Sequence, residues 1–397
     1  MKSNPFRIAG LFAGIGGIER GFHHAYGEGV ETPLLCEWWG PAQDVLAAHF
    51  PESVLHPDVR ELTTLPAGLD LLAAGFPCTD LSQAGRTAGI EGENSGLVRH
   101  VFEALALAKS MPKWLMIENV QNMLALDGGK AMRYLLDEIE ALGFRWAYRV
   151  VDSRFTGVPQ RRRRVILLAS AIEDPCAVLL ADDAGPRPDT DYSDDAFGFY
   201  WTEGRLGLGW ARDAVPTLKG GSTVGIPSPP AIWVPGDPIE RRFIKPSIED
   251  AEALQGFPRG WTDVFPESGR KNGPRWKMVG NAVTVGVSNW VARRIADPGQ
   301  VDVDHREWTR RGPWPTAAWG EPGGRIVEAL VSEFPEHQPY QHLLDVVDAD
   351  AAEPLTERGA LGFAQRLQRG NLGREPGFRG DVAQYVEQFA ARVAASA

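Results

Sequence analysis

One cysteine and one glutamate in this sequence could together carry out nucleophilic chemistry. Cys78 and Glu118 each stand at the carboxyl end of a short apolar stretch. A thiolate is a strong nucleophile, a carboxyl group can bind or transfer a proton, and a positively charged neighbour favours the thiolate over the thiol. These residue types predict covalent attack by sulfur with assisted proton handling, provided that the fold brings them together.

The position of Cys78 favours an accessible thiol. The apolar run 69–74 is short and bounded by glycine and proline, so it predicts a buried parallel strand. Open α/β sheets bind ligands at the carboxyl ends of their strands, and Pro77 ends this strand just before the cysteine. The alternative is a small structural residue, because free cysteines are usually buried and inert. The Pro-Cys pair alone does not decide between these roles.

Glu118 occupies the corresponding position on another predicted strand, 114–118. Its carboxyl group would face the same crevice as Cys78, so that attack and proton handling could be divided between two side chains. The alternative is that Glu118 caps the turn that follows it. The residue alone favours neither role.

A glycine-rich turn near the N-terminus predicts close approach of the backbone to a ligand. The apolar strand 7–12 enters the turn 13–17 (Ala-Gly-Ile-Gly-Gly), and a helix begins directly afterwards. A second strand, 33–37, ends in Glu37, 20 residues after this turn. A carboxylate there can accept hydrogen bonds from the ribose hydroxyls of an adenosine-containing cofactor. It could equally be a charge at the N-terminus of the helix that begins near Pro41.

The elements that must position these residues alternate between strands and helices. Such alternation predicts an α/β fold with a parallel sheet covered by helices on both faces. The predicted helices are 41–50, 96–109 and 129–142, and the further strands are 146–151 and 164–170. The polar, glycine-punctuated stretch 79–96 is too long for a simple connection and is typical of a lid or a disordered segment.

Composition limits the class of protein. The 397 residues are 43% hydrophobic and 23% charged, as in a soluble globular protein with a large and a smaller domain. The three cysteines form no CxxC pair and no zinc-type cluster, and no apolar signal or membrane-spanning run occurs. We therefore predict a cytoplasmic protein without a structural metal and without a membrane partner.

The net charge of −11 argues against a polyanionic partner, but the basic residues are clustered. Four consecutive arginines occupy 161–164, and five basic residues against two acidic ones lie between 259 and 277. Such clusters permit binding of nucleic acid, although an arginine run is more often a solvated face.

Regular alternation ends near residue 170. Glycine, proline and tryptophan punctuate the segment 171–240, a composition that suits recognition by loops. Ser247 and Asp250 predict a capping box for a helix that ends at Gly256. A later amphipathic helix, 280–294, could cover the sheet again, so the chain would leave the first domain and return to it.

Six motifs, taken in order, resemble those of the DNA (cytosine-5)-methyltransferase family. They are Phe12-Ala13-Gly14-Ile15-Gly16-Gly17, Gly75-Phe76-Pro77-Cys78, Glu118-Asn119-Val120, Pro159-Gln160-Arg161-Arg162-Arg163-Arg164, Leu254-Gln255-Gly256-Phe257-Pro258 and Gly280-Asn281-Ala282-Val283. The resemblance covers roughly residues 7–297. Each motif is weak by itself, but six in the family's order make coincidence negligible, and Cys78 becomes the expected nucleophile.

The resemblance implies a Rossmann-like class I S-adenosylmethionine-dependent methyltransferase domain, a smaller irregular target-recognition domain and a C-terminal helical extension. We expect the catalytic domain at 1–170, the recognition domain at 171–274, a return helix that completes the catalytic domain at 275–297, and the extension at 298–397. The extension could be an accessory helical unit or a partner-binding module.

The implied reaction is methylation of carbon 5 of a cytosine that is flipped out of duplex DNA, at a cost on the order of a few kcal/mol of stacking and pairing. Cys78 would add to carbon 6, and Glu118 would hydrogen-bond or protonate ring nitrogen 3. A free thiol has a pKa of about 8.5 and needs a positive neighbour to ionise at neutral pH. Arg162 and Arg164 match the two arginines of the family motif, and Arg164 is preferred for holding the base and the thiolate.

The implied methyl donor is S-adenosyl-L-methionine, which leaves as S-adenosyl-L-homocysteine. Its expected contacts are Phe12, Gly14, Gly16, Glu37 on the ribose, Trp38 against the adenine, Asp58 near the adenine amino group, Pro77, Leu97, Asn281 and Val283. The expected contacts with duplex DNA are Thr79, Ser82, Gln83, Arg205, Arg212, Lys219, Ser222 and Thr223. We also expect a monomer on DNA, which either has a cognate restriction endonuclease as a functional partner or acts alone as a solitary methyltransferase.

Two departures from the family pattern leave the catalytic set intact. Thr79 stands where the family commonly has Gln, so the contacts of the following loop with opened DNA stay undetermined, and the residues before Leu254 lack the usual Leu-Thr-Pro lead. Two rival functions are cytosine methylation in tRNA and DNA binding without catalysis. The large recognition segment favours DNA, and the presence of Cys78, Glu118 and Arg164 favours catalysis.

Overall fold

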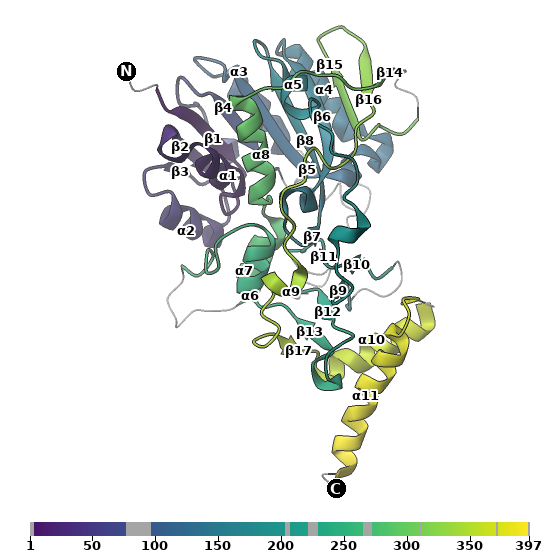
Figure 1. Cartoon of the computed structure of the whole chain (residues 1–397). Helices are drawn as coiled ribbons and strands as arrows, with labels where there is room; N and C mark the ends of the chain where they lie inside the picture. Colours follow the sequence, from purple (N-terminus) through teal and green to yellow (C-terminus); the bar gives the residue numbers. More distant parts are fainter. Residues whose placement is uncertain are drawn as a thin grey trace.

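The computed structural model describes residues 4–76, 97–202, 207–220, 229–264, 272–309, 312–370 and 372–395. Cys78 and the rest of the stretch 77–96 lie outside these ranges. A large sheet with flanking helices forms one part of the molecule, a smaller sheet forms the other, and the chain ends on a long helix that points away from both (Figure 1).

A ten-stranded sheet organises the larger part. Its order is β14-β16-β15-β6-β8-β5-β4-β1-β2-β3. The strands are β1 (Phe6–Leu11), β2 (Val30–Cys36), β3 (Val54–His56), β4 (Leu71–Ala74), β5 (Trp114–Val120), β6 (Arg145–Asp152), β8 (Arg163–Ser170), β14 (His305–Trp308), β15 (Ala317–Gly320) and β16 (Ile326–Ala329). Strands β3, β2, β1, β4 and β5 are mutually parallel, as the alternation of strands and helices predicts.

The expectation of a wholly parallel sheet is wrong for β8. This strand pairs antiparallel with both β5 and β6. The chain turns from β6 into β8 through the short segment 153–162, which contains a 3-10 turn and the two-residue strand β7 (Gln160–Arg161) but no crossover helix. A connection that short returns a strand only in the antiparallel sense.

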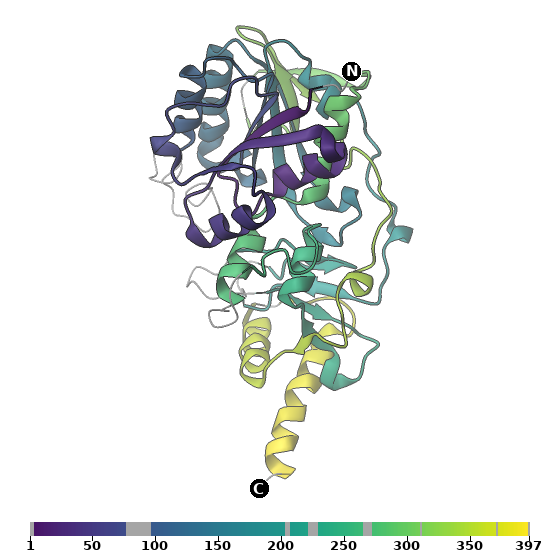
Figure 2. The ribbon, with the colours of Figure 1, turned by 90° about the vertical axis from the view of Figure 1, so that its left-hand side faces the viewer.

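Helices cover both faces of this sheet. One face carries α1 (Gly17–Tyr26), α5 (Pro175–Leu179) and α8 (Val285–Ala296), and the other carries α3 (Val98–Ala106) and α4 (Lys130–Ala141). Helix α2 (Gly40–His49) follows β2. Helices α1 and α8 pack side by side, so the chain returns to the sheet after the irregular region (Figure 2).

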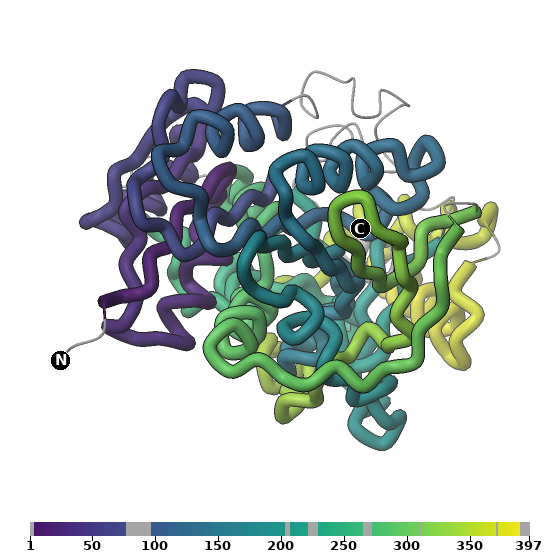
Figure 3. The backbone as a smooth tube through the Cα atoms, turned by 90° about the horizontal axis from the view of Figure 1, so that it is seen from above, coloured from purple at the N-terminus to yellow at the C-terminus, as the bar shows by residue number. Residues whose placement is uncertain are grey.

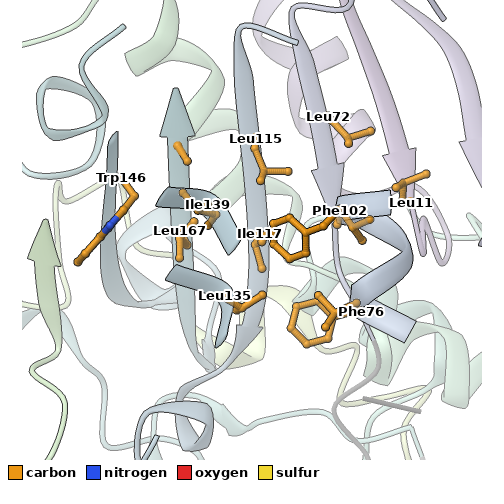
Figure 4. Packing of buried hydrophobic residues seen from close by; sticks show 14 of the residues in the cluster. Leu11, Leu72, Phe76, Phe102, Leu115, Ile117, Leu135, Ile139, Trp146 and Leu167 are labelled. Carbon is orange, nitrogen blue, oxygen red and sulfur yellow. The ribbon is translucent and has the colours of Figure 1, made fainter. Parts of the chain in front are cut away.

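The core under α3 and α4 explains why the apolar strand segments are continuous instead of alternating. Leu115 and Ile117 of β5 lie in one layer with Leu72 of β4 and Leu167 of β8, and Phe102 of α3 covers them (Figure 4). Since both faces of the sheet are covered, the central positions of these strands are apolar, and polar side chains stand only towards the strand ends.

A five-stranded sheet organises the smaller part, in the order β10-β9-β12-β13-β17. Its strands are β9 (Phe197–Phe199), β10 (Ala211–Arg212), β12 (Ala231–Trp233), β13 (Phe243–Lys245) and β17 (Glu353–Pro354), while β11 (Val215–Pro216) pairs with β7. The helices nearby are α6 (Ile248–Leu254), α7 (Asn272–Asn281) and α9 (Leu343–Val346). Ser247 and Asp250 form the predicted capping box at the start of α6.

The last hundred residues are shared between the two parts. Helices α10 (Glu357–Gly370) and α11 (Phe378–Ala395) are present, as a helical extension predicts. The sequence analysis did not anticipate the strands: β14, β15 and β16 extend the large sheet beyond β6, at the end opposite the N-terminal strands (Figure 3). Strand β17 pairs with β13 of the small sheet.

A buried carboxyl group lies under the large sheet. Glu19 of α1 is 1% exposed and faces Gly10 of β1, where an added Cβ would overlap its Oε1 atom. Its Oε2 atom has no hydrogen-bond partner among the described residues. Burial raises the pKa of Glu19 to about 7, against a smaller opposing effect of a backbone hydrogen bond.

Glu19→Gln is expected to flatten the dependence of stability on pH. Because the pKa of Glu19 is higher in the folded state, this state binds more protons than the unfolded chain between about pH 4.5 and about pH 7. The stabilisation by Glu19 is complete below this window and falls as the pH rises through it, by about 3 kcal/mol in total. Urea unfolding at about pH 5 and about pH 8 measures the change, and an equal fall in wild type and variant would contradict the assignment.

Candidate active site

The carboxyl ends of three neighbouring parallel strands converge on one point. Phe12 follows β1, Gly75 follows β4 and Glu118 lies near the end of β5. A Cβ built on Gly75 would stand 3.9 Å from Glu118 Oε2 and 3.9 Å from the Phe12 carbonyl oxygen. Glu118 Oε2 therefore faces the strand end that leads, three residues later, to Cys78.

Glu118 is held by Arg164 of the adjacent strand. Their distance from Glu118 Oε1 to Arg164 Nε is 3.0 Å, and the side chains are 9% and 14% exposed. Glu118 pairs with Ile166 and Val120 pairs with Arg164 in the antiparallel register, so Glu118 and Arg164 are diagonal neighbours on one face. One carboxylate oxygen is thus fixed by an ion pair while the other is directed towards Gly75.

Arg162 has a different role in the structure from Arg164. Its guanidinium is buried and donates from Nη1 to Leu218 O (3.1 Å) and Gly280 O (3.2 Å), and from Nη2 to Ala282 O (2.8 Å). Burial, followed by the charge of Arg164, lowers the pKa of Arg162. The terminal nitrogens are therefore committed to backbone carbonyls of two distant segments, and only Arg164 pairs with Glu118.

Gln160 completes this junction, although the sequence analysis gave it no role. Its Oε1 accepts from Leu218 N (3.1 Å) and its Nε2 donates to Leu254 O (2.9 Å). Gln160 and Arg162 thereby bind both backbone polar groups of Leu218. A glutamine and an arginine two residues apart on an extended segment point to the same side, which is the signal that could have predicted the shared partner.

Glu37 and the glycine turn form a second constellation. Glu37 accepts hydrogen bonds from Gly14 N through Oε2 and from Trp39 N through Oε1, each at 2.9 Å. Burial raises the pKa of Glu37, and these two backbone bonds and the charge of Lys277 oppose the shift. Each oxygen keeps a lone pair, so a ligand hydroxyl can still be accepted.

The turn itself leaves room for a ligand. Gly14 has a φ of +58°, and a Cβ built there would meet no described atom within 4 Å. Gly16 has a φ of +80° and precedes α1, and a Cβ on Gly17 would overlap the carbonyl oxygen of Val283. The segment that contains Val283 thus lies against the turn, as expected for one closed pocket.

The remaining expected cofactor contacts differ in their surroundings. Trp38 is 71% exposed, so its ring is available for stacking. Leu97 is half-buried against the core and Asn281 is exposed. Asp58 accepts from Arg60 Nε at 3.0 Å through both oxygens, and this side-chain hydrogen bonding lowers the pKa of Asp58 against an opposing effect of burial. The carboxylate of Asp58 is therefore already paired with Arg60.

Lys277 is a further basic residue at this pocket that the sequence analysis did not single out. Its Nζ atom lies 4.5 Å from the centroid of the Trp39 ring, and its charge favours the ionised form of Glu37. Lys277 stands on α7 one turn before Asn281. That spacing places both side chains on one helix face and could have indicated Lys277 from the sequence.

The expected DNA contacts are only partly described. Arg212 pairs with Asp194 at 2.7 Å and donates to Tyr192 O at 3.0 Å, and Lys219 Nζ lies 4.0 Å from the centroid of the Tyr200 ring. The expected site residues outside the described ranges are Pro77, Cys78, Thr79, Ser82, Gln83, Arg205, Ser222 and Thr223.

Within the described ranges, no group of three His, Cys, Asp or Glu side chains is arranged to hold a metal ion. None of the helices in that part of the chain is both long and apolar enough to cross a membrane.

The chain is similar to known methyltransferases in sequence and fold. The family described as C-5 cytosine-specific DNA methylase matches residues 6–182. The Type II methyltransferase M2.BsuMI of Bacillus subtilis (strain 168) is 43% identical over 373 residues, which cover 91% of this chain and 93% of that protein. The Type II methyltransferase M.BsuFI of Bacillus subtilis is 35% identical over 160 residues, 40% of this chain and 37% of that protein.

The similarity also extends to a solved structure. The crystal structure of the S. pombe Dnmt2 methyltransferase superposes with a TM-score of 0.54 over 73% of this chain and 98% of that chain, at 14% identity. At that identity the likeness concerns the fold alone. The match to M2.BsuMI, by contrast, leaves out so little of the chain that it must include much of the C-terminal region.

Proposed function

This chain belongs to the C-5 cytosine-specific DNA methylase family, and we propose that it methylates carbon 5 of a flipped-out cytosine in a specific duplex DNA sequence through a covalent adduct with Cys78. The observation that carries the proposal is the orientation of Glu118. Arg164 holds one of its carboxylate oxygens, and the other faces Gly75, just before Cys78. A carboxyl group in that place can serve the ring of a base that Cys78 attacks.

The proposed chemistry begins with the thiolate of Cys78. Its sulfur forms a bond to carbon 6 of the cytosine ring, and the displaced electron pair makes carbon 5 nucleophilic. Glu118 binds or protonates ring nitrogen 3, which prevents negative charge from building up in the ring. After carbon 5 has gained the methyl group, its proton passes to water while the bond between carbon 6 and sulfur breaks, which restores the thiolate and the aromatic ring.

S-Adenosylmethionine, when bound, supplies the methyl group as an electrophile. The pocket formed by the glycine turn, Glu37 and Trp38 fits this group, because Gly14 leaves space where a Cβ would stand and Glu37 can still accept hydroxyl hydrogen bonds. Glu37 would hold the ribose and the exposed Trp38 ring would cover the adenine. The charge of Lys277 opposes the rise in the pKa of Glu37 that burial causes.

Recognition of DNA is assigned to the smaller part of the molecule, where side chains on loops can read base edges. We propose a monomer on duplex DNA. Because the chain is 43% identical to a Type II methyltransferase over 91% of its length, we further propose that it protects DNA from a cognate restriction endonuclease.

The decisive experiment is bisulfite sequencing of DNA from a host that lacks other methyltransferases and expresses only this protein. Conversion-resistant cytosines confined to one short sequence are expected. Purified enzyme with tritiated methyl donor should label duplex DNA and leave tRNA unlabelled. If tRNA is labelled and duplex DNA is not, the substrate is tRNA and the proposal of duplex DNA is wrong.

Glu37→Ala is expected to weaken binding of the methyl donor specifically. Its loss removes the proposed ribose acceptor and releases Gly14 N and Trp39 N from their hydrogen bonds. We expect the KM for S-adenosylmethionine to rise about tenfold to a hundredfold, while the Kd for duplex DNA measured without the donor stays within about twofold. Glu31→Ala, which alters an exposed carboxylate on β2, the strand that leads to Glu37, is the matched control.

A further inference from the structure

Two adjacent aromatic residues, Tyr200 and Trp201, lie at a junction that no motif marks. They follow β9 and directly precede the stretch 203–206. Both side chains are half-buried. We call them the aromatic pair. They contact residues on both sides of the stretch 221–228, namely Thr217 before it and Pro229 after it.

Tyr200 binds the chain on the N-terminal side of that stretch. Its hydroxyl donates to Thr217 O at 2.8 Å, and the Nζ atom of Lys219 lies 4.0 Å from its ring centroid. The backbone of Tyr200 also receives support, since its N–H donates to Leu208 O at 2.7 Å. Tyr200 thus fixes the residues that lead into position 221.

Trp201 binds the chain on the C-terminal side. Its indole Nε1 donates to Pro229 O at 2.9 Å, immediately after residue 228. One dipeptide therefore holds both ends of an eight-residue stretch that contains Ser222 and Thr223.

The C-terminal helix α10 supports the aromatic pair from behind. Arg366 Nη2 donates to Trp201 O at 2.7 Å, and a Cβ on Gly359 would stand 2.9 Å from the Trp201 ring. Phe199, just before the pair, is buried in a cluster with Phe363 of α10 and Phe378 of α11. Figure 2 shows α10 on the same side of the molecule as α7, which contributes to the cofactor pocket.

The N-terminal end of the stretch is also tied to the active site. Gln160 and Arg162 hold Leu218, and a Cβ on Gly280 would overlap the backbone of Lys219 and Gly220. The aromatic pair therefore connects the C-terminal helices to a segment that contacts the catalytic machinery.

We propose that Tyr200 and Trp201 are positioning residues for target selection, and that α10 belongs to the DNA-reading machinery through them. The proposal rests on the proposed function and adds to it a specificity role for the C-terminal region. Side chains that read bases discriminate only if their backbone is fixed in register with the duplex. Removing the contact at either end of the stretch should therefore lower discrimination between the target and near-target duplexes more than it lowers the methylation rate on the target.

Tyr200→Phe and Trp201→Phe test this with minimal change, since each keeps an aromatic ring and removes one hydrogen bond. The readout is the ratio of kcat/KM on the target duplex, first identified in the wild type, to kcat/KM on duplexes that differ by one base pair. We expect each variant to lower this ratio about fivefold to tenfold and to leave the KM for the methyl donor unchanged.

The matched control is Trp233→Phe. Trp233 lies in the same aromatic cluster and its Nε1 donates to Asp381 Oδ2 at 2.8 Å, but it holds neither end of 221–228. It should lower the thermal unfolding midpoint about as much as Trp201→Phe does and leave discrimination unchanged. If both tryptophan variants lose stability and neither loses discrimination, the aromatic pair is only structural and the proposal fails.

Arg366 separates the contribution of α10 from that of the pair itself. Arg366→Ala should reproduce the loss of discrimination of Trp201→Phe, and Arg366→Lys, which can still donate to Trp201 O, should recover part of it. If Arg366→Ala discriminates between duplexes as well as the wild type does, α10 has no part in target selection. Absence of any methylation by the wild type would instead overturn the proposed function, so the two failures are distinguishable.

Discussion

Replacing Cys78 with serine is expected to reduce methyl transfer by at least about a thousandfold while binding of duplex DNA survives. A serine hydroxyl is a far weaker nucleophile than a thiolate at neutral pH, and no other described residue can replace it. The two described cysteines are poor candidates. Burial, with the charges of Glu37 and Asp58, raises the pKa of Cys36 to about 12, and burial also raises the pKa of Cys176.

The measurement combines two assays. Transfer of tritiated methyl groups gives the rate, and gel retardation of a target duplex gives the affinity. Cys176→Ser is the matched control, because it makes the same substitution at a cysteine remote in sequence from the motifs and should retain activity. Substantial turnover in Cys78→Ser would remove Cys78 from the mechanism.

A duplex with 5-fluorocytosine at the target position provides an independent check. Fluorine at carbon 5 cannot leave as a proton does, so the adduct should accumulate after methyl transfer. We expect a band that migrates as a covalent complex with wild type and none with Cys78→Ser. Active enzyme that forms no such band would argue against covalent addition.

The sequence predicted most of the large sheet because its local signals agree with its tertiary environment. The apolar runs that became β4 and β5 are buried on both faces, and the glycine turn is followed by α1 as expected. The direction of β8 could not be read from its composition. A strand covered on both faces has the same apolar character in either orientation, and only the length of the connection from β6 sets its direction.

The C-terminal region shows a second limit. The amphipathic pattern of α10 is visible in the sequence, but its partners are Phe199 and Trp201, more than 150 residues earlier. The strands β14, β15 and β16 are short strands at one end of the large sheet, with β14 at its edge, and their identity depends on pairing with β6 and with one another. Pairing over such separations leaves no local signal.

Within the candidate site, the sequence indicated which residues lie there, but it did not show which partner each of them contacts. Both arginines match the motif and Arg164 was preferred at the base, but the contacts of Arg162 with the return segment were not foreseen; in the structure Arg162 donates to Ala282 O and Arg164 lies beside Glu118. The difference arises because β7 ends before Arg162 and β8 begins after it, so the two arginines belong to different surroundings. Asp58 was expected at the adenine, and its pairing with Arg60 could not be inferred from the motif.

Glu118→Gln is expected to lower kcat by about 10² to 10⁴. The amide has nearly the same volume, but it cannot supply a proton to ring nitrogen 3, and it removes the carboxylate charge that pairs with the largely buried guanidinium of Arg164. Because Glu118 would act during attack, formation of the 5-fluorocytosine adduct should slow by a similar factor. In this respect Glu118→Gln differs from Cys78→Ser, which should form no adduct at all.

The matched control is Glu333→Gln. Glu333 pairs with Arg163 at 2.7 Å, the residue next to Arg164, and successive residues of β8 point to opposite faces of the sheet. The two substitutions therefore remove the same kind of ion pair from the same strand, one on the side of Gly75 and one away from it. Near wild-type kcat in Glu333→Gln with a strong loss in Glu118→Gln assigns the effect to the site. Equal losses would mean that the ion pairs act through the stability of β8, and Glu118 would then have no separate part in catalysis.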